Sequence, residues 1–264
     1  MQIGPTLEIP KGFNLKRICG FAALSNALNI YNLNSFNLNE LVELGRSNGI
    51  TNFGELFSVD WLFNFINKYW PNLNLKIGSE MDCSLIIKHF LKGENEKKQY
   101  KKGVLSLTFT LSFLMFYFCR IISTILIPYD CDRGNFEPCN RNGVGAHWAI
   151  LTGFIFLSNK ENNSNCKDNN KIIKLIDSNE FLMDENLNED CLYLIAYQGK
   201  SSHPAIWPFP ILFQSNAQLN IPTTTTECQN NNGNNKTNFC LPPEGINISL
   251  RGKCLLLNGR KKNK

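Results

Sequence analysis

Residues 19–31 read Cys-Gly-Phe-Ala-Ala-Leu-Ser-Asn-Ala-Leu-Asn-Ile-Tyr and predict a buried amphipathic helix that begins with a cysteine. The apolar side chains recur three and four positions apart, which is the spacing of one helix face. They are Ala23, Leu24, Ala27, Leu28 and Tyr31. Cys19 therefore stands in the first turn, where unpaired backbone N–H groups and the helix dipole favour a negative charge.

The rest of the first half also has helical patterns. A second helix opens at Asn37, with Glu40 three residues later in the capping-box position. A third is predicted over 58–69, ended by Pro71, and a fourth over 84–91.

The second half changes to short runs of β-branched and aromatic residues bounded by Asn, Asp, Gly or Pro, which are typical of strands. These runs are 125–127, 147–156, 171–176 and 191–197. Helices first and strands afterwards predict an α+β domain.

The length of 264 residues fits a single domain over 1–264. Two segments depart from the globular pattern: an apolar insertion at about 94–124 and an Asn- and Thr-rich loop at about 220–240. Residues 104–119 approach the length of a membrane span, but Arg120 interrupts the apolar run and Pro128 follows it. An apolar insertion is therefore preferred to a membrane span.

Composition argues against several other classes. The net charge of +5 is mild and the basic residues are scattered, so nucleic acid is not an expected partner. The ten cysteines are irregularly spaced and no secretory signal opens the chain, so we expect free thiols in the cytoplasm. Cys131, Cys139, His147 and Cys166 lack the paired spacing of a zinc site, and no phosphate-binding loop is present. Neither a metal nor a cofactor is expected.

Cys19 is the candidate nucleophile, because a thiol attacks a carbonyl as the thiolate and a helix start favours that form. An imidazole must take its proton, and the chain offers His89, His147 and His203. His89 falls inside a predicted helix and His203 in a polar loop, where packing or surface roles are expected. His147 opens a predicted strand, and a rigid strand end holds an imidazole accurately. Cys19 and His147 are therefore the preferred catalytic pair.

Two neighbours extend this hypothesis. Gly20 is expected to let a substrate carbonyl approach the backbone N–H groups that stabilise an oxyanion, and Trp148 is expected to shield the pair from water. The oxyanion donor itself stays unassigned. A structural alternative also remains open, since a cysteine at a helix start is often a small buried residue.

The residues around Cys19 and His147 resemble the actin maturation protease family of papain-like cysteine peptidases. The match begins at 19–24 (CGFAAL) and continues in collinear blocks to residue 257. The further blocks are 54–59 (GELFSV), 127–130 (IPYD), 137–139 (EPC), 145–149 (GAHWA), 197–201 (YQGKS), 214–219 (QSNAQL) and 252–257 (GKCLLL).

The resemblance implies a papain-like, C39-like fold in which N-terminal helices carrying the cysteine pack on a mainly antiparallel sheet. It implies an aminopeptidase that removes the acetylated Met, or acetylated Cys in other actins, from the N-terminus of immature actin. Cys19 would be the acyl-accepting nucleophile and His147 the general acid and base. Actin is the implied partner, while profilin docking is in doubt because no long proline-rich leader precedes Cys19.

A third catalytic member has two candidates. Asp177 ends the predicted strand 171–176 and is preferred, because a carboxylate both orients an imidazole and stabilises its cation. Gln198 ends the next predicted strand inside one of the blocks. Three alternatives to the function also stay open: a related thiol peptidase with another protein substrate, a non-catalytic binding protein, and a membrane-anchored protein.

Overall fold

One antiparallel sheet organises the fold of the computed structural model, which describes residues 18–33, 36–79, 82–95, 123–156, 189–201, 203–220 and 239–260. Its strand order is β1-β6-β2-β3-β4-β5, and each neighbouring pair is antiparallel. The strands are β1 (Leu73–Ser79), β2 (Ser123–Asp130), β3 (Ala146–Phe156), β4 (Leu192–Tyr197), β5 (Ala205–Pro208) and β6 (Lys253–Arg260).

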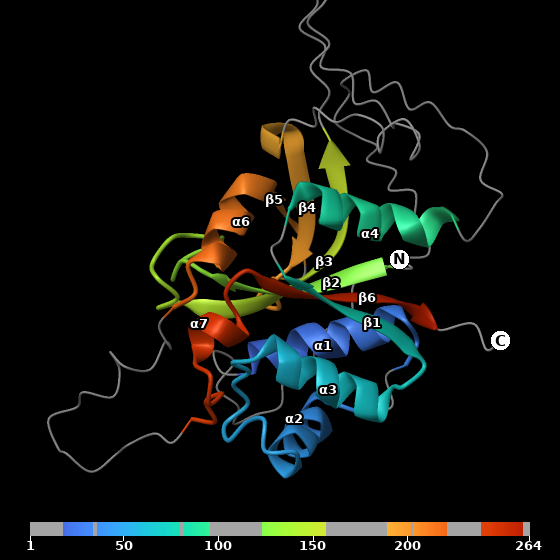
Figure 1. Cartoon of the computed structure of the whole chain (residues 1–264), viewed down its shortest axis with the longest axis vertical. Coiled ribbons are helices and arrows are strands. Elements are labelled where there is room, and N and C mark those ends of the chain that lie inside the picture. The colour runs from blue at the N-terminus through green and yellow to red at the C-terminus, as the bar shows by residue number, and fades with distance from the viewer. Residues whose placement is uncertain are drawn as a thin grey trace, which may run out of the picture.

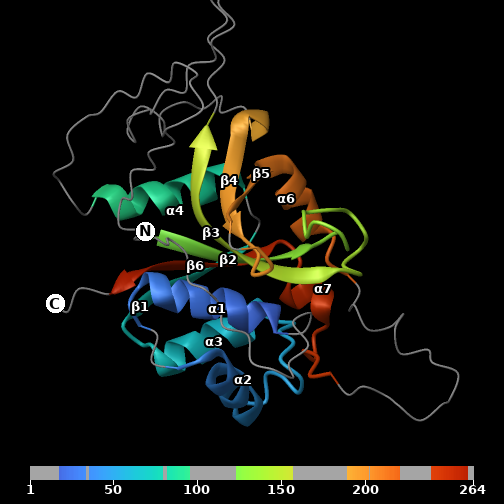
Figure 2. The same ribbon diagram turned by 180° about the vertical axis from the view of Figure 1, so that it is seen from behind.

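Helices cover both faces of this sheet (Figure 1). In that view α1, α2 and α3 lie below the sheet and α4 and α6 above it, and Figure 2 shows the same two layers from behind. The helices are α1 (Cys19–Ile30), α2 (Leu38–Ser47), α3 (Val59–Tyr69), α4 (Cys83–Asn95), α6 (Phe209–Ala217) and α7 (Ile246–Ser249), with a short 3-10 turn, η1 (Glu189–Cys191).

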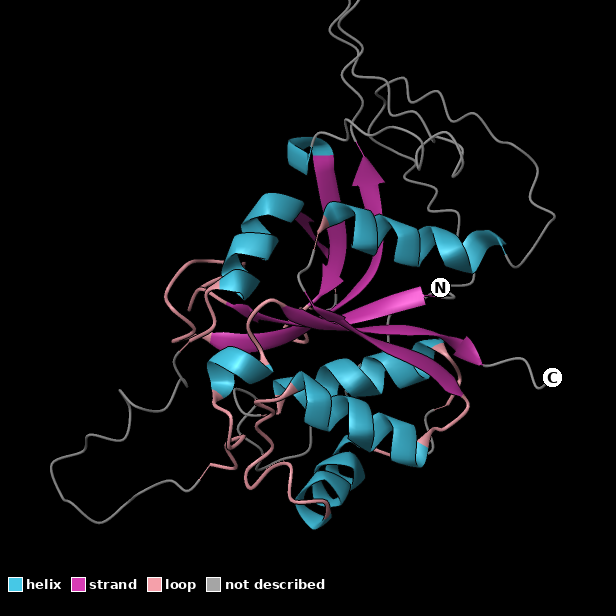
Figure 3. Cartoon of the chain, in the orientation of Figure 1, coloured by secondary structure: helices cyan, strands magenta, loops and turns pink. Residues whose placement is uncertain are grey.

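Each face of the sheet has its own apolar core. The first joins α1, α2 and α3 to the sheet around Phe21, Leu24 and Trp148, and the second joins α4 and α6 to it around Ile86, Tyr129 and Leu212. The antiparallel pairing of every neighbouring strand confirms the predicted α+β class and the mainly antiparallel sheet, and Figure 3 shows the helices on both sides of that sheet.

The predicted helices are confirmed, and α2 has the predicted cap. Asn37 and Glu40 form the expected capping box at α2, with Asn37 Oδ1 accepting from the Glu40 N–H at 3.0 Å and Glu40 Oε2 from the Asn37 N–H at 2.8 Å. Ser58 caps α3 in the same way, through its side-chain oxygen and the Trp61 N–H. The fourth helix, predicted over 84–91, runs longer as α4.

Three of the predicted strands are confirmed as β2, β3 and β4, although Cys191 falls in η1 rather than in β4. Sequence patterns missed β1, β5, β6, α6 and α7. Strand β6 is the clearest omission, because it lies between β1 and β2 inside the sheet. Its apolar stretch spans only Cys254–Leu257 before polar residues follow, and so short a run does not indicate a central strand.

Some predictions fall outside the described residues. These are the strand 171–176 with Asp177, the apolar run 104–119, and most of the Asn- and Thr-rich loop. Within the described ranges, no helix has the length and apolar character that crossing a membrane requires.

Candidate active site

Cys19 and His147 meet where the start of α1 packs against the start of β3. Helix α1 contacts β3 along the sheet, which brings its first residue to the second residue of that strand. The Cys19 thiol shares a side-chain hydrogen bond with the His147 ring, and the Trp148 backbone N–H also donates to the sulfur. The two residues that sequence reasoning paired, 128 positions apart in the chain, are therefore in contact.

The other side of the imidazole is held by the backbone that follows β4. His147 Nε2 lies 2.8 Å from the carbonyl oxygen of Gln198, and the ring is buried. A carbonyl oxygen only accepts hydrogen bonds, so Nε2 carries the proton and Nδ1 is left for the sulfur. Among the described residues, the group that orients the ring is therefore the backbone carbonyl of Gln198 rather than its side chain, while the preferred candidate Asp177 lies outside the described residues and stays a prediction.

The pKa values of the two groups move in opposite directions. Burial raises the pKa of the Cys19 thiol, but the charge and hydrogen bond of His147 outweigh burial and bring the pKa below its ordinary value. Burial lowers the pKa of His147, but the Cys19 charge and hydrogen bond outweigh it and bring this pKa above its ordinary value. Both shifts favour a thiolate–imidazolium pair.

The pKa values of several other thiols shift in the opposite direction. Burial raises the pKa of Cys83 to about 11 and the pKa values of Cys131 and Cys254 to about 12. Burial also raises the pKa of Cys139 and Cys240. Among the cysteines that the structure describes and whose pKa shifts, only Cys19 is moved toward the reactive thiolate.

Two aromatic rings flank the imidazole, and neither is the one expected. The ring centroids of Tyr129 and Phe136 each lie 5.7 Å from that of His147. Trp148 was expected to shield the pair, but it packs in the core of the α1 face, with Nε1 donating to the Leu56 carbonyl at 3.0 Å. Successive strand residues point to opposite faces, so the residue after His147 is directed away from its ring.

Gly20 also serves a different purpose from the one predicted. It is buried, and a Cβ at this position would lie 2.7 Å from the Leu56 side chain. Its lack of a side chain lets α1 pack closely on the loop before α3 rather than opening space for a substrate. The same loop approaches Ile18, since a Cβ on Gly54 would lie 2.4 Å from that residue's side chain.

Asp130, at the end of β2, organises the loop that leads to His147, and sequence reasoning did not single it out. The residue is fully buried. Its carboxylate accepts backbone hydrogen bonds from Arg141 at 2.6 Å, Gly143 at 3.0 Å and Gly145 at 2.8 Å. The amide Nε2 of Gln218 adds a contact at 3.2 Å. The family resemblance contained a signal that could have identified Asp130. Three of its matching blocks converge on this residue: 127–130, 145–149 and 214–219.

Glu55 performs the same task on the other side of Cys19. Its buried carboxylate accepts from the N–H groups of Asn52 and Phe53, at 3.0 and 2.7 Å, and from the Cys240 N–H at 3.0 Å. The Thr51 hydroxyl donates to it as well, at 3.0 Å. This carboxylate fixes the loop 51–55, which supports the residue before the nucleophile.

The remaining candidates take structural positions. His89 is buried in α4 with Nε2 3.0 Å from the Thr124 carbonyl, and His203 is exposed, so the packing and surface roles predicted for them are confirmed. Cys131, Cys139 and His147 do not form a metal site, and no cluster of three or more metal-ligating side chains occurs within the described ranges. Asp177 lies outside those ranges.

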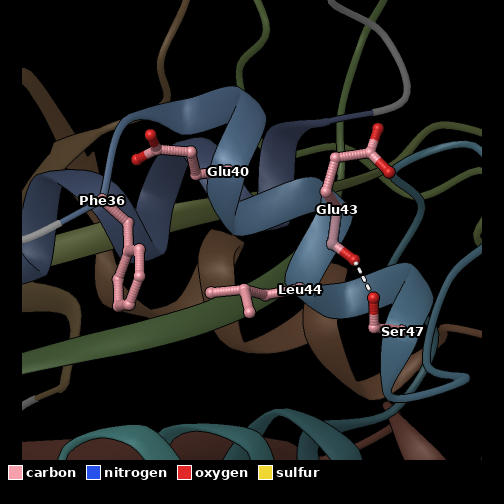
Figure 4. Close-up of a pocket in the computed structure, with 5 residues that line it drawn as sticks. All are labelled: Phe36, Glu40, Glu43, Leu44 and Ser47. Atoms are coloured by element: carbon pink, nitrogen blue, oxygen red, sulfur yellow. Dashed lines mark hydrogen bonds between the residues drawn. The ribbon is translucent and has the colours of Figure 1, made fainter.

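A surface pocket lies on α2 and on the residue two positions before that helix (Figure 4). It is lined by Phe36, Glu40, Glu43, Leu44 and Ser47. Glu40 is occupied by the capping box and Glu43 pairs with Arg46, so its carboxylates already have structural partners. No cysteine or histidine lines it.

Sequence comparison relates the chain to one family. A family model described as "Actin maturation protease-like, C-terminal domain" matches residues 10–97 and 110–155. The actin maturation protease of Drosophila melanogaster is 28% identical over 267 residues, which cover 99% of this chain and 69% of that protein. The actin maturation protease of Xenopus tropicalis is 30% identical over 240 residues, covering 90% and 68%. No solved structure gives a significant match.

Proposed function

Because the chain belongs to the actin maturation protease-like family, we propose that it is a cysteine peptidase that removes the acetylated N-terminal Met or Cys of immature actin. The observation that carries the proposal is the contact of Cys19 with the buried His147 ring, with pKa shifts that favour a thiolate beside an imidazolium. The names of the relatives supply the protease activity and actin as substrate.

The first step is attack of the Cys19 thiolate on the carbonyl carbon between the acetylated residue and the next one. A C–S bond forms and the carbonyl electrons move to its oxygen. Backbone N–H groups in the first turn of α1 are the proposed oxyanion donors, because they have no partner within the helix. Consistent with this, no side chain within the described residues caps α1 at Ile18.

The second step is loss of the amine. The His147 imidazolium gives its Nδ1 proton to the leaving nitrogen, the C–N bond breaks and a thioester remains on Cys19. The neutral imidazole then takes a proton from water, whose oxygen attacks the thioester. Release of the acetylated amino acid restores the thiolate and the imidazolium. The Gln198 carbonyl keeps Nε2 protonated throughout, so the same ring nitrogen serves both half-reactions.

The wider architecture supports this assignment. We propose a papain-like, C39-like fold, because the cysteine begins a helix that packs against the strand carrying the histidine. A single domain over 1–264 is also proposed, supported by the pairing of β6 with β1 and β2. A reducing compartment, the cytoplasm, suits a thiol nucleophile and the free cysteines of the described ranges.

The test is cleavage of an acetylated actin N-terminal peptide, followed by mass spectrometry. The wild-type protein is expected to release the acetylated first residue, and Cys19→Ala to release none. Cys191→Ala is the matched control, because η1 lies at the opposite end of β4 from Gln198. Circular dichroism and the thermal midpoint report whether both variants remain folded.

Each outcome separates the alternatives. Cleavage that survives in folded Cys19→Ala contradicts the thiol mechanism. A wild-type protein that cleaves unrelated acetylated peptides as fast as the actin peptide is a thiol peptidase with another substrate. A folded protein that cleaves neither is a non-catalytic binding protein.

A further inference from the structure

We propose that Phe136 is a positioning residue, whose ring keeps the His147 imidazole in contact with the Cys19 thiol. The inference rests on the proposed function, because it assigns a supporting residue to the same site. It adds that the imidazole is held by a side chain that the loop between β2 and β3 places there against the preference of its own backbone.

The backbone of Phe136 has a conformation that an aromatic side chain disfavours. Among the described residues, three that are not glycine have a positive φ: Asn32 at 53°, Phe136 at 60° and Asn142 at 57°. Asparagine enters this left-handed region comparatively easily, because its short polar side chain can hydrogen-bond locally, whereas a bulky aromatic residue rarely does. The surrounding structure therefore has to impose the conformation of Phe136.

Hydrogen bonds fix the chain on both sides of Phe136. Asp132 Oδ1 accepts from the backbone N–H groups of Asn135 and Glu137, each at 3.0 Å, and the Asp132 N–H donates to the Glu137 carbonyl at 3.0 Å. The Tyr129 hydroxyl donates to the Phe136 carbonyl at 2.8 Å. These bonds hold the left-handed conformation and thereby set the direction of the Phe136 ring.

The imposed conformation places this ring against the imidazole. The centroid of the Phe136 ring lies 5.7 Å from that of His147, the same distance as the centroid of Tyr129. Tyr129 is the partner of His147 across β2 and β3 and is fully buried, whereas Phe136 is half-buried. Of the two rings that flank the imidazole, Phe136 is therefore the one nearer the solvent.

The imidazole needs this support because one of its two hydrogen bonds is broken during the proposed reaction. Nε2 keeps its bond to the Gln198 carbonyl, but Nδ1 gives its proton to the leaving amine and loses its bond to the Cys19 sulfur. A ring held by one hydrogen bond can turn about that bond. Packing against Phe136 limits this movement and keeps Nδ1 directed at the reacting atoms.

Phe136→Gly separates the role of the ring from the stability of the loop. Glycine adopts a φ of 60° without strain, so Phe136→Gly is expected to unfold at a higher temperature than Phe136→Ala, in which the strain remains. The reverse order would contradict the imposed backbone conformation. Circular dichroism during heating measures both midpoints.

Three further variants complete the comparison. Phe136→Asn is a second variant without the ring, because asparagine already occupies left-handed positions at 32 and 142. Phe136→Tyr keeps an aromatic ring at the position. Asn142→Gly is the matched control, since it replaces an exposed left-handed residue of the same loop and leaves Phe136 in place.

The first readout is the pH midpoint of Cys19 alkylation by iodoacetamide, which needs no substrate. Burial raises the pKa of Cys19 and the contact with His147 lowers it, so opening the site alone would lower the midpoint, whereas loosening the contact would raise it. We expect a rise toward the roughly 8.5 of a free thiol in Phe136→Gly and Phe136→Asn, and no change in Phe136→Tyr or Asn142→Gly. Every variant keeps the titratable neighbours of the pair, which are Tyr129, Cys131 and Lys200.

Cleavage kinetics are the second readout. In Phe136→Gly, kcat for the acetylated actin peptide should fall by at least about tenfold while KM changes little, because a misplaced imidazole slows the chemistry without removing a substrate contact. Phe136→Tyr should restore most of kcat.

The outcomes separate this assignment from the proposed function. A Cys19 midpoint that stays constant or falls in the folded variants without the ring, an equal rise in Asn142→Gly, or a loss confined to KM overturns the role of Phe136. A wild-type protein that cleaves no actin peptide contradicts the proposed function instead, and the alkylation midpoints still decide whether Phe136 positions the imidazole.

Discussion

Seven cysteines among the described residues are free, and their thiols differ in the groups that surround them. Cys131 and Cys254 are enclosed by apolar neighbours, and burial raises their pKa values to about 12. Cys19 is half-buried, and its contact with His147 outweighs the effect of burial on its pKa. At the scale of the residue, the low pKa of the Cys19 thiol therefore depends on one imidazole.

Alkylation distinguishes these thiols directly. Iodoacetamide at neutral pH is expected to modify Cys19 at least about tenfold faster than Cys131 or Cys254, because only the thiolate reacts. His147→Ala removes the stabilising charge and should slow the modification of Cys19. Peptide mapping by mass spectrometry at short reaction times measures each rate, and equal rates at the three cysteines would refute the ion pair.

The pH profile of kcat/KM reports the same pair. Activity is expected to fall at low pH as the thiolate takes up a proton, with an apparent pKa below the roughly 8.5 of a free thiol. It should fall again at high pH as the imidazolium loses its proton, with an apparent pKa above the roughly 6.5 of free histidine. Initial rates at low substrate concentration across the pH range give both limbs. A single rise near pKa ~8.5 would contradict the shifts.

At the scale of the element, the loop between β2 and β3 is built around one carboxylate. Asp130 satisfies three of its backbone N–H groups, and a Cβ on Gly145 would lie 2.3 Å from the Cys131 carbonyl oxygen. Phe136 in this loop packs on the imidazole. The buried Asp130 carboxylate thus stabilises the conformation of the loop. The loop in turn places Phe136 beside the imidazole.

Asp130→Asn tests this arrangement. The amide nitrogen would face N–H donors that need an acceptor, so we expect the free energy of unfolding to fall by about 2–3 kcal/mol. Urea denaturation followed by circular dichroism measures it. Glu43→Gln on the surface of α2 is the control and should change stability by less than about 0.5 kcal/mol. A matching small effect at both positions would mean that the carboxylate does not hold the loop.

At the scale of the whole molecule, strand β6 joins the first half of the chain to the second within one sheet. Strand β6 pairs with β1 on one side and β2 on the other, and Leu255 and Leu257 enter the core of the α1 face. Asn216 reinforces this junction, with Nδ2 donating to the carbonyls of Pro128 and Lys253 at 2.7 and 3.1 Å. The two halves therefore share one sheet.

Removal of this strand tests the shared sheet. A chain ending at Leu250 is expected to lose the cooperative thermal transition, because β1 and β2 would each expose an unpaired edge and two buried cores would open. Differential scanning calorimetry of the full and shortened chains measures it. A chain ending at Gly259 keeps most of β6 and should unfold close to the full-length midpoint. A cooperative transition in the chain ending at Leu250 would show that the first half folds without β6.

Local chemistry let the amino-acid sequence alone determine the helices α1, α2 and α3, the capping box and the strands β2, β3 and β4, and it led to the prediction of Cys19 and His147 as a pair. Helical periodicity, caps and β-branched runs are properties of neighbouring residues, so they can be read without a fold. The tertiary structure decided that β6 lies between β1 and β2, that the Gln198 backbone orients the imidazole, and that Asp130 holds the loop beside it. These contacts join residues far apart in the chain through backbone groups that every residue carries, and only the packed sheet selects among them.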